Sequence, residues 1–256
     1  MEGLTDKMAG HSKFKNIMHR KGAQDKKRAK LFSRLIREIS VASKIGGGDP
    51  DSNPRLRAAV NNALSSNMSK DSIQKAINKN QVNTQNDQIF EIIYEGFGPS
   101  GVAIIIESLT DNKNRSASEI RSTFSKYNGN LGISGSVKHN FQKTGIISYS
   151  KDIDGFESFF EHCLTMSVED VIDSENSFDV ITALESFHDV ILNLEKKYSL
   201  PKFSSIEWRP INIVEVNNED QARKLLILLD KLEDLDDVQT VFSNFNIDEE
   251  LMNRLI

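Results

Sequence analysis

The sequence predicts an α+β protein in which an N-terminal three-helix bundle precedes two ferredoxin-like α/β domains, one inserted in the other. Before residue 80, apolar residues recur every three or four positions, which is the spacing of a helix face. From residue 89 onward, short apolar runs are separated by turn residues, which is typical of strands. These runs alternate with helical segments in the order β-α-β-β-α-β, the order of a split β-α-β unit.

The first helix is expected over residues 23–45, because one set of apolar residues recurs at spacings of 3, 4 and 3. A set of basic residues recurs at spacings of 3, 4, 3 and 7 and points to the nearly opposite side. Gly46, Gly47 and Gly48 then end the helix. The apolar set consists of Phe32, Leu35, Ile39 and Ala42.

Two shorter helices are expected to complete the bundle. Asn53 is a suitable cap for the second helix, with Pro54 at its first position, where the fixed φ of proline suits a helix. Ser69 is a suitable cap for the third, and Met68 is placed to pack against Ile73 as a hydrophobic staple.

Beyond a polar linker at residues 81–88, the period of the apolar residues changes. Residues 89–95 alternate, residues 98–101 form a turn, and residues 102–109 form an almost continuous apolar run, as in a buried central strand. We then expect a helix that begins with a capping box at Ser116 and Glu119 and ends at Gly129, and a further strand over residues 136–141.

A second set of elements is expected over residues 142–209. It consists of a strand at 145–150, a helix at 156–166, paired strands at 169–174 and 177–184, a helix at 187–198 and a strand at 203–209. A strand at 211–216, a helix at 220–232 and a strand at 238–245 then complete the half-sheet of residues 89–141. The expected division is a flexible basic arm at 1–22, a helical domain at 23–84, an α/β domain formed by 85–141 and 210–248, and an inserted α/β domain at 142–209.

The net charge of −5 conceals a division along the chain. Residues 1–85, the basic head, contain 17 Lys and Arg against 7 Asp and Glu, whereas residues 86–256 contain 15 against 30. A head of net +10 on a body of net −15 predicts an anionic partner for the head.

Phosphate binding needs several cations along one path, because each contact releases condensed counterions. Only Asp25 and Glu38 offset the basic residues between positions 8 and 45, so we favour nucleic-acid binding over a solvated helix face. The candidate residues are Lys13, Lys15, Arg20, Lys21, Lys26, Lys27, Arg28, Lys30, Arg34, Arg37 and Lys44. Arg55 and Arg57, and Arg115 and Arg121 near the start of a later helix, are further candidates for phosphate contacts.

Other features of the sequence favour structural roles. The Gly46–Gly48 run lacks the Lys and Ser/Thr of a P-loop and is expected to be a turn. Glu95 contradicts an RNA-recognition strand at residues 95–98. Cys163 is expected to be a core thiol. Asp234, Asp236 and Asp237 are expected to form an exposed acidic turn, either a solvated loop or a contact for a basic partner.

Long segments of the chain are very similar to the YebC/PmpR family. These segments are GHSKFKNIMHRKGAQDKKRAKLFSRLIREI, GGGDPDSNPRLRAAVNNAL, YEGFGPSGVAIIIESLTDNKNRSASEIRSTF and LEDLDDVQTVFSNF. The resemblance implies a three-domain fold, one helical and two α/β, and a DNA-binding transcriptional regulatory protein. Relatives described as ribosome-binding translation factors imply the alternative, which is a translational activator that binds ribosomal RNA.

The function that we expect is therefore regulation of gene expression by a cytoplasmic, non-enzymatic protein that binds duplex DNA or ribosomal RNA. An enzyme is the third and weakest alternative, because no catalytic constellation is recognisable. Neither a cofactor, a metal ion nor a small-molecule substrate is expected. A membrane location is not expected either, because no apolar run reaches the ~18 residues that span a bilayer.

Overall fold

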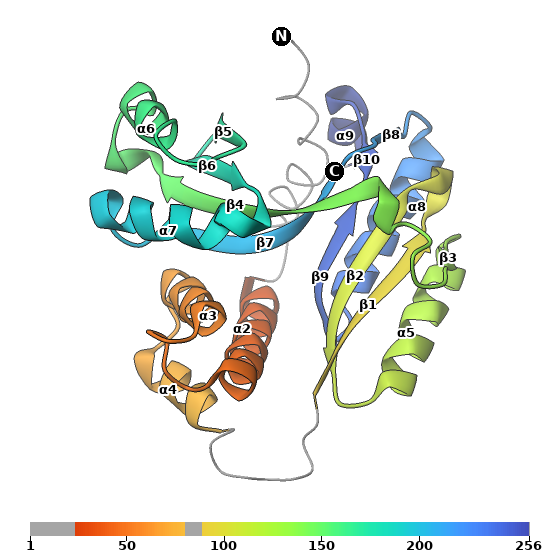
Figure 1. The fold of residues 1–256 in the computed structure, drawn as a ribbon. Coiled ribbons are helices and arrows are strands. Elements are labelled where there is room, and N and C mark those ends of the chain that lie inside the picture. The colour runs from red at the N-terminus through yellow and green to blue at the C-terminus, as the bar shows by residue number, and fades with distance from the viewer. Residues whose placement is uncertain (1–23, 80–88, 256) are drawn as a thin grey trace. The chain divides into compact units, whose positions relative to one another are not determined.

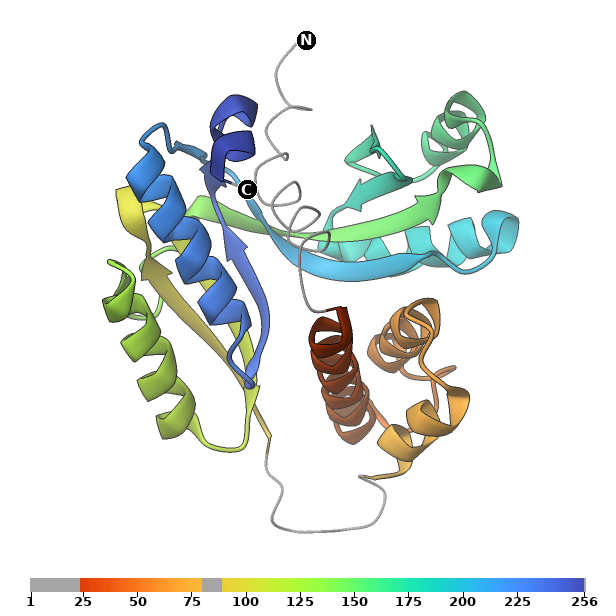
Figure 2. The same cartoon turned by 180° about the vertical axis from the view of Figure 1, so that it is seen from behind.

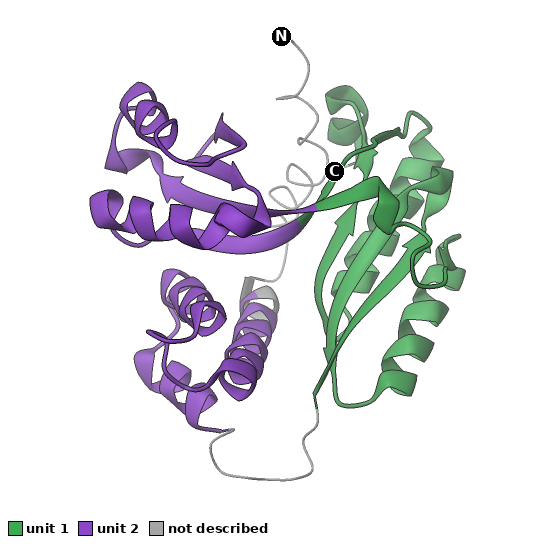
Figure 3. Ribbon diagram, viewed as in Figure 1, with its two compact units in different colours: residues 1–24, 86–142, 208–256 green, residues 25–85, 143–207 purple. Residues whose placement is uncertain are grey.

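The structure, a computed structural model, describes residues 24–79 and 89–255 (Figure 1). The chain divides into two compact units (Figure 3). Unit 1 contains residues 86–142 and 208–256 together with 1–24, and unit 2 contains residues 25–85 and 143–207. The expected arm at 1–22 and linker at 81–88 lie outside the described residues, and the predicted domain boundaries stay a prediction.

Three helices come first in the described chain, as predicted. They are α2 (Gln24–Gly46), α3 (Pro54–Ser65) and α4 (Lys70–Asn78). Their shared core includes Ile39, Leu56, Met68 and Ile73. The predicted caps are confirmed, since the Asn53 side chain accepts a hydrogen bond from the N–H of Leu56 and the Ser69 hydroxyl accepts one from the N–H of Ser72.

Asn53 also joins the end of α2 to the start of α3. Its Nδ2 donates to the carbonyl oxygens of Ala42 and Gly47, each at 2.8 Å, and the residue is only 5% exposed. A Cβ atom at Gly46 would lie 2.6 Å from this amide, so only glycine fits beside it. Gly47 has a φ of +89°, which glycine adopts without steric cost. The glycines therefore end α2 and make room for the amide.

The end of α4 is closed by side chains of α2. The hydroxyls of Ser40 and Ser43 donate to the carbonyl oxygens of Ala76 and Ile77, at 3.2 and 3.1 Å. The last carbonyl groups of a helix lack partners within the helix. These two bonds supply partners from another helix and thereby fix α4 against α2.

Residues 141–210 contain a four-stranded sheet with two helices, in the predicted order β-α-β-β-α-β. The strands lie in the order β5-β6-β4-β7, with β4–β6 and β5–β6 antiparallel. Phe159, Cys163, Val180 and Leu194 are in the core between sheet and helices. The elements are β4 (Phe141–Ser150), α6 (Phe156–Cys163), β5 (Asp170–Asp173), β6 (Ser177–Thr182), α7 (Leu184–Tyr198) and β7 (Phe203–Pro210).

Within unit 2, one side chain connects the helices to the edge strand of this sheet. The Asn62 amide of α3 donates to the carbonyl oxygen of Ser204 at 2.9 Å and accepts from its N–H at 3.1 Å. The amide thus takes the place of a neighbouring strand at one position of β7, where an unpaired edge would otherwise be exposed.

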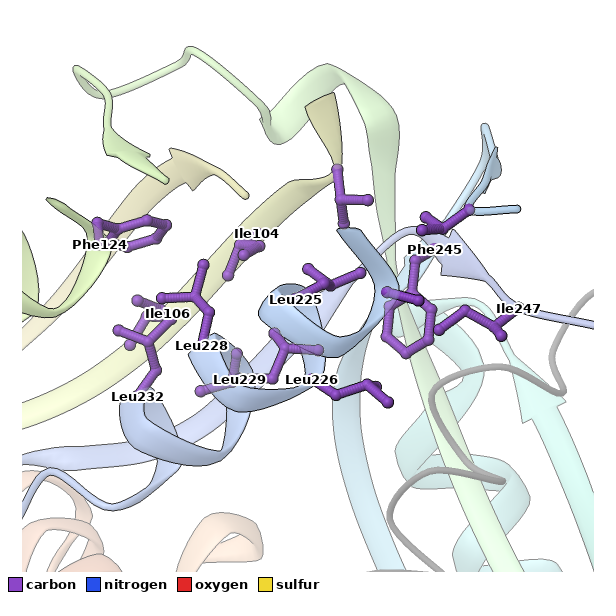
Figure 4. Packing of buried hydrophobic residues seen from close by; sticks show 14 of the residues in the cluster. Ile104, Ile106, Phe124, Leu225, Leu226, Leu228, Leu229, Leu232, Phe245 and Ile247 are labelled. Atoms are coloured by element: carbon purple, nitrogen blue, oxygen red, sulfur yellow. The ribbon is translucent and has the colours of Figure 1, made fainter. Parts of the chain in front are cut away.

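Unit 1 contains a second antiparallel sheet, in the order β3-β1-β2-β9, with α5 and α8 on one face (Figure 2). Leucines of α8 pack against Ile104 and Ile106 of β2 and against Phe124 of α5 (Figure 4). The elements are β1 (Phe90–Phe97), β2 (Ala103–Thr110), α5 (Lys113–Lys126), β3 (Asn130–Leu131), β8 (Val214–Glu215), α8 (Glu219–Glu233), β9 (Val238–Ser243), β10 (Phe245–Asn246) and α9 (Glu249–Leu255).

The α+β class and the two antiparallel sheets are confirmed, but the predicted order of elements in unit 1 is wrong. Strands β1 and β2 lie where strands were expected, on either side of the turn at 98–101, and they pair as a hairpin, so the chain order begins β-β-α-β and does not follow the expected β-α-β-β-α-β. The strand predicted at 136–141 is a turn with a short 3₁₀ helix (Lys138–Asn140). Of the strand predicted at 211–216, only Val214–Glu215 is a strand, paired in parallel with β10. Helix α9 was not predicted.

The start of α5 also differs from its prediction. The cap is Asn112, whose side chain accepts from the N–H of Arg115, and not Ser116. Ser116 lies inside the helix and is buried. Its hydroxyl donates a hydrogen bond to the carboxylate of Asp237 and does not cap the helix. In the chain from 24 to 79 and from 89 to 255, we find no helix with the length and apolar character needed to cross a bilayer.

We predict that Asn53→Ala opens the junction between α2 and α3. The loss of three hydrogen bonds should cost about 1–3 kcal/mol and leave buried carbonyl groups without partners. Hydrogen exchange should report faster exchange of the Leu56 amide. Asn78→Ala is the control, because the Asn78 side chain is exposed and accepts a hydrogen bond from Gln74 on the same helix. Equal Leu56 protection in both variants would contradict this role.

Candidate nucleic-acid interface

The predicted basic face lies largely on α2, whose sequence holds seven basic and two acidic residues. Lys13, Lys15, Arg20 and Lys21 lie outside the described residues. Lys26 and Lys27 belong to α2 but precede the first residue whose side chain is described, Arg28. From that point, Arg28 and Lys44 are exposed, and Lys30, Arg34 and Arg37 are half-buried.

Arg28 is held in place by an aromatic neighbour. Its guanidinium carbon lies 5.4 Å from the ring centroid of Phe32, one turn further along α2. A cation over a ring face keeps its charge and its outward hydrogen-bond donors. Arg28 therefore presents a positioned charge at the exposed start of the helix.

The two candidates on α3 have structural partners. Arg55 forms a forked ion pair with Glu38 of α2, with Nε–Oε1 and Nη2–Oε2 distances of 2.7 and 3.1 Å. Arg57 donates to the carbonyl oxygens of Pro50 and Asp51, at 3.1 and 2.8 Å. Arg55 thus neutralises an acid on α2, and Arg57 closes the loop between α2 and α3. The predicted phosphate contacts of these two residues remain untested.

Arg115 on α5 is engaged by two carboxylates. Its Nη2 lies 2.7 Å from Oδ1 of Asp111 and 2.8 Å from Oδ2 of Asp237. The bond to Asp237, and then that to Asp111, raise the pKa of Arg115 further above its usual value. A phosphate would have to compete with both acids for this side chain. Arg121, by contrast, is exposed on the same helix.

Asp237 is buried, which corrects the prediction that it belongs to an exposed acidic turn. Its Oδ2 accepts from the hydroxyls of Ser116 and Thr110, at 2.6 and 3.0 Å, as well as from Arg115. Burial raises the pKa of this carboxyl group, but the bonds to Ser116, Arg115 and Thr110 outweigh burial and lower it overall. The carboxylate therefore ties α5 and the end of β2 to the turn before β9.

Glu95 is a second buried carboxylate that sequence reasoning did not assign a role. It is 2% exposed and accepts from the N–H groups of Gly135, Val137 and Lys138, at 2.8, 2.9 and 3.1 Å. Burial raises its pKa, but these three bonds and the Lys138 charge outweigh that effect and lower it. These bonds hold residues 135–138 as a turn, which is why no strand forms there.

The structure also tests the predictions for the cysteine and for metal ligands. Cys163 is fully buried, and burial raises its pKa to about 11, so the prediction of a core thiol is confirmed. Across residues 24–79 and 89–255, no three His, Cys, Asp or Glu side chains are grouped as metal ligands.

Two family models match nearly the whole chain. One, described as the TACO1/YebC protein N-terminal domain, matches residues 12–83, and the other, described as the TACO1/YebC second and third domain, matches residues 89–245. The fold resembles the crystal structure of a conserved hypothetical protein from Aquifex aeolicus. The TM-score is 0.81 with 42% identity, covering 88% of this chain and 93% of that one.

Curated relatives match over almost their full lengths. A protein of Zymomonas mobilis is 51% identical over 248 residues, which are 97% of this chain and 99% of the relative. A protein of Geobacter sulfurreducens is 48% identical over 249 residues, 97% of this chain and 100% of the relative. A Rickettsia bellii protein is 48% identical over 244 residues, 95% and 96% of the two chains. All three are named probable transcriptional regulatory proteins.

We predict that Asp237→Asn destabilises unit 1 in a pH-dependent way. Because the pKa of Asp237 is lowered on folding, its contribution is complete above the unfolded pKa of about 3.9 and is lost as the pH falls through the folded pKa. The variant's deficit in melting temperature should therefore be largest near pH 7 and shrink below about pH 4. Asp220→Asn, at an exposed residue, is the control. A deficit that is the same at both pH values would refute the electrostatic part of this role.

Proposed function

Because the chain belongs to the TACO1/YebC family, we propose that it is a transcriptional regulator that binds duplex DNA through the cationic face of α2. The relatives that match it end to end are named regulatory proteins, and no enzyme activity is named for them. What we propose beyond these names is the target, duplex DNA, and the surface that binds it, the cationic face of α2.

The observation that carries the proposal is the charge of α2. The 23 residues of α2 include seven basic and two acidic residues. One of the two acids, Glu38, is already paired with Arg55 of α3. Cations that neutralise phosphates release counterions, which supplies most of the affinity of nucleic-acid binding. A helix with this imbalance is suited to lie along a phosphate backbone.

The charge of the rest of the chain favours one orientation of the bound polyanion. Residues 86–256 carry 30 acidic against 15 basic residues and would repel phosphate groups in general. Binding is thereby directed to the head. Phosphate contacts of this kind position the protein but do not themselves select a sequence.

A non-catalytic role agrees with the state of the buried titratable groups. Glu95 and Asp237 each accept three hydrogen bonds that hold turns, and Cys163 lies in an apolar core where its thiol stays protonated. A catalytic acid, base or nucleophile must instead reach a substrate. Because these three groups are buried and engaged in the fold, they are not placed to act on a substrate, which agrees with a function in binding.

The proposal predicts a steep dependence of DNA affinity on salt and on α2 charge. For about six phosphate contacts, affinity should fall about 10³-fold between 50 and 200 mM salt. Arg28→Glu plus Lys44→Glu, at two exposed positions of α2, should weaken binding to a 30-base-pair duplex by at least about tenfold, or ~1.4 kcal/mol. Fluorescence anisotropy with the full chain measures both effects.

Lys70→Glu plus Lys79→Glu provides the matched control, because both residues are exposed on or next to α4 and the charge change is the same. This control should stay within about threefold of the wild type, under ~0.7 kcal/mol. Equal losses in the two variants would show that only net charge matters. Titration with a structured RNA in parallel tests the alternative target, since tighter binding to RNA than to DNA would overturn the choice of duplex DNA.

A further inference from the structure

Helix α5 is locally basic within the acidic part of the chain. Its 14 residues contain four basic residues and one acidic residue, Glu119. Residues 86–256 as a whole contain twice as many acidic as basic residues. A solvated helix in such a region is expected to share its acidic character, so the basic character of α5 is a local exception.

One side of α5 packs into the core of unit 1, and the opposite side is exposed. Ser116, Ile120 and Phe124 are buried. The exposed side carries side chains at spacings of 4, 3, 1 and 3, which share one face of a helix. This α5 face consists of Asn114, Ser118, Arg121, Ser122 and Ser125.

The cations of α5 divide into engaged and available ones. Arg115 is held by Asp111 and Asp237, and the ammonium groups of Lys113 and Lys126 lie 4.0 and 5.6 Å from the ring centroids of Phe90 and Tyr127. Arg121 has no hydrogen bond or ion pair with any residue that the structure describes. Glu119, two positions earlier, lies about 200° around the helix from Arg121, at roughly 100° per residue. Arg121 is therefore the available charge of the α5 face.

The neighbouring helix α8 shows what a solvated helix in this unit looks like. It lies on the same face of the sheet as α5 (Figure 2) and contains three basic and four acidic residues. Arg223 pairs with Glu219 at 3.2 Å, and Lys231 with Asp234 at 3.2 Å. Two of its three basic residues are thus paired with acids of α8 or of its C-cap, whereas the α5 face has hydroxyl and amide groups around an arginine.

Hydroxyl, amide and guanidinium donors on one helix face are the groups that contact the phosphate oxygens of nucleic acids. We propose that the α5 face is a second contact surface for the phosphate backbone of duplex DNA, separate from the basic head. This proposal rests on the proposed function, since it assumes that the chain binds nucleic acid. Two surfaces on one chain raise the affinity for a polymer long enough to reach both, because the second contact is then intramolecular.

The test compares Arg121→Glu with Lys224→Glu in the full chain. Lys224 is an exposed lysine of α8, so the control makes the same change of charge on the adjacent helix. Binding to a 60-base-pair DNA duplex and to a structured RNA of similar length is measured over a series of salt concentrations. Circular dichroism and melting temperature verify that both variants remain folded.

Arg121→Glu should weaken binding about tenfold and reduce the slope of log affinity against log salt by about one, as expected for the loss of one phosphate contact. Lys224→Glu should stay within about threefold. A larger loss on the RNA than on the DNA duplex would overturn duplex DNA as the occupant of the α5 face. Equal affinities of the two variants for both polymers would overturn the α5 surface while leaving the proposed function intact, whereas the absence of any wild-type binding would overturn the proposed function itself.

Discussion

The side-chain amide of Asn53 is the contact on which the arrangement of the basic helices depends. The ends of helices leave backbone groups without partners, and this amide bonds two carbonyl groups near the end of α2 while it caps α3. Ser40 and Ser43 do the same for the end of α4. The orientation of the α2 cations relative to α3 and α4 therefore follows from a few buried polar contacts together with the apolar core.

Buried carboxylates have the corresponding role in unit 1. Glu95 binds three N–H groups of one turn, and Asp237 binds two hydroxyls and Arg115. A buried carboxylate must be paired or well hydrogen-bonded, because its desolvation is costly. Some acids of this part of the chain thus stabilise the fold, and Asp237 also binds one cation of α5. Arg115 is engaged by Asp237, whereas Arg121, which is also exposed, has no hydrogen bond or ion pair with a described residue.

Sequence patterns predicted the helices of the N-terminal part well, because the relevant signals are local. Each signal spans only a few positions of the sequence. Glycine ends α2 at Gly46, and the caps Asn53 and Ser69 each accept a hydrogen bond from the N–H group three positions later. Ser116 gave a false signal, since a serine followed three positions later by glutamate satisfies the pattern of a capping box anywhere. Its actual partner, Asp237, is 121 positions away. No local pattern indicates such a bond.

The sequence by itself determined the α+β class, the division of charge and the set of candidate cations, because periodicity and composition act residue by residue. The tertiary structure decided the turn held by Glu95 and the partners of Arg55, Arg57 and Arg115. These depend on which distant groups meet when the chain packs. A buried charge or an unpaired backbone group then selects the arrangement that supplies its hydrogen-bond partners.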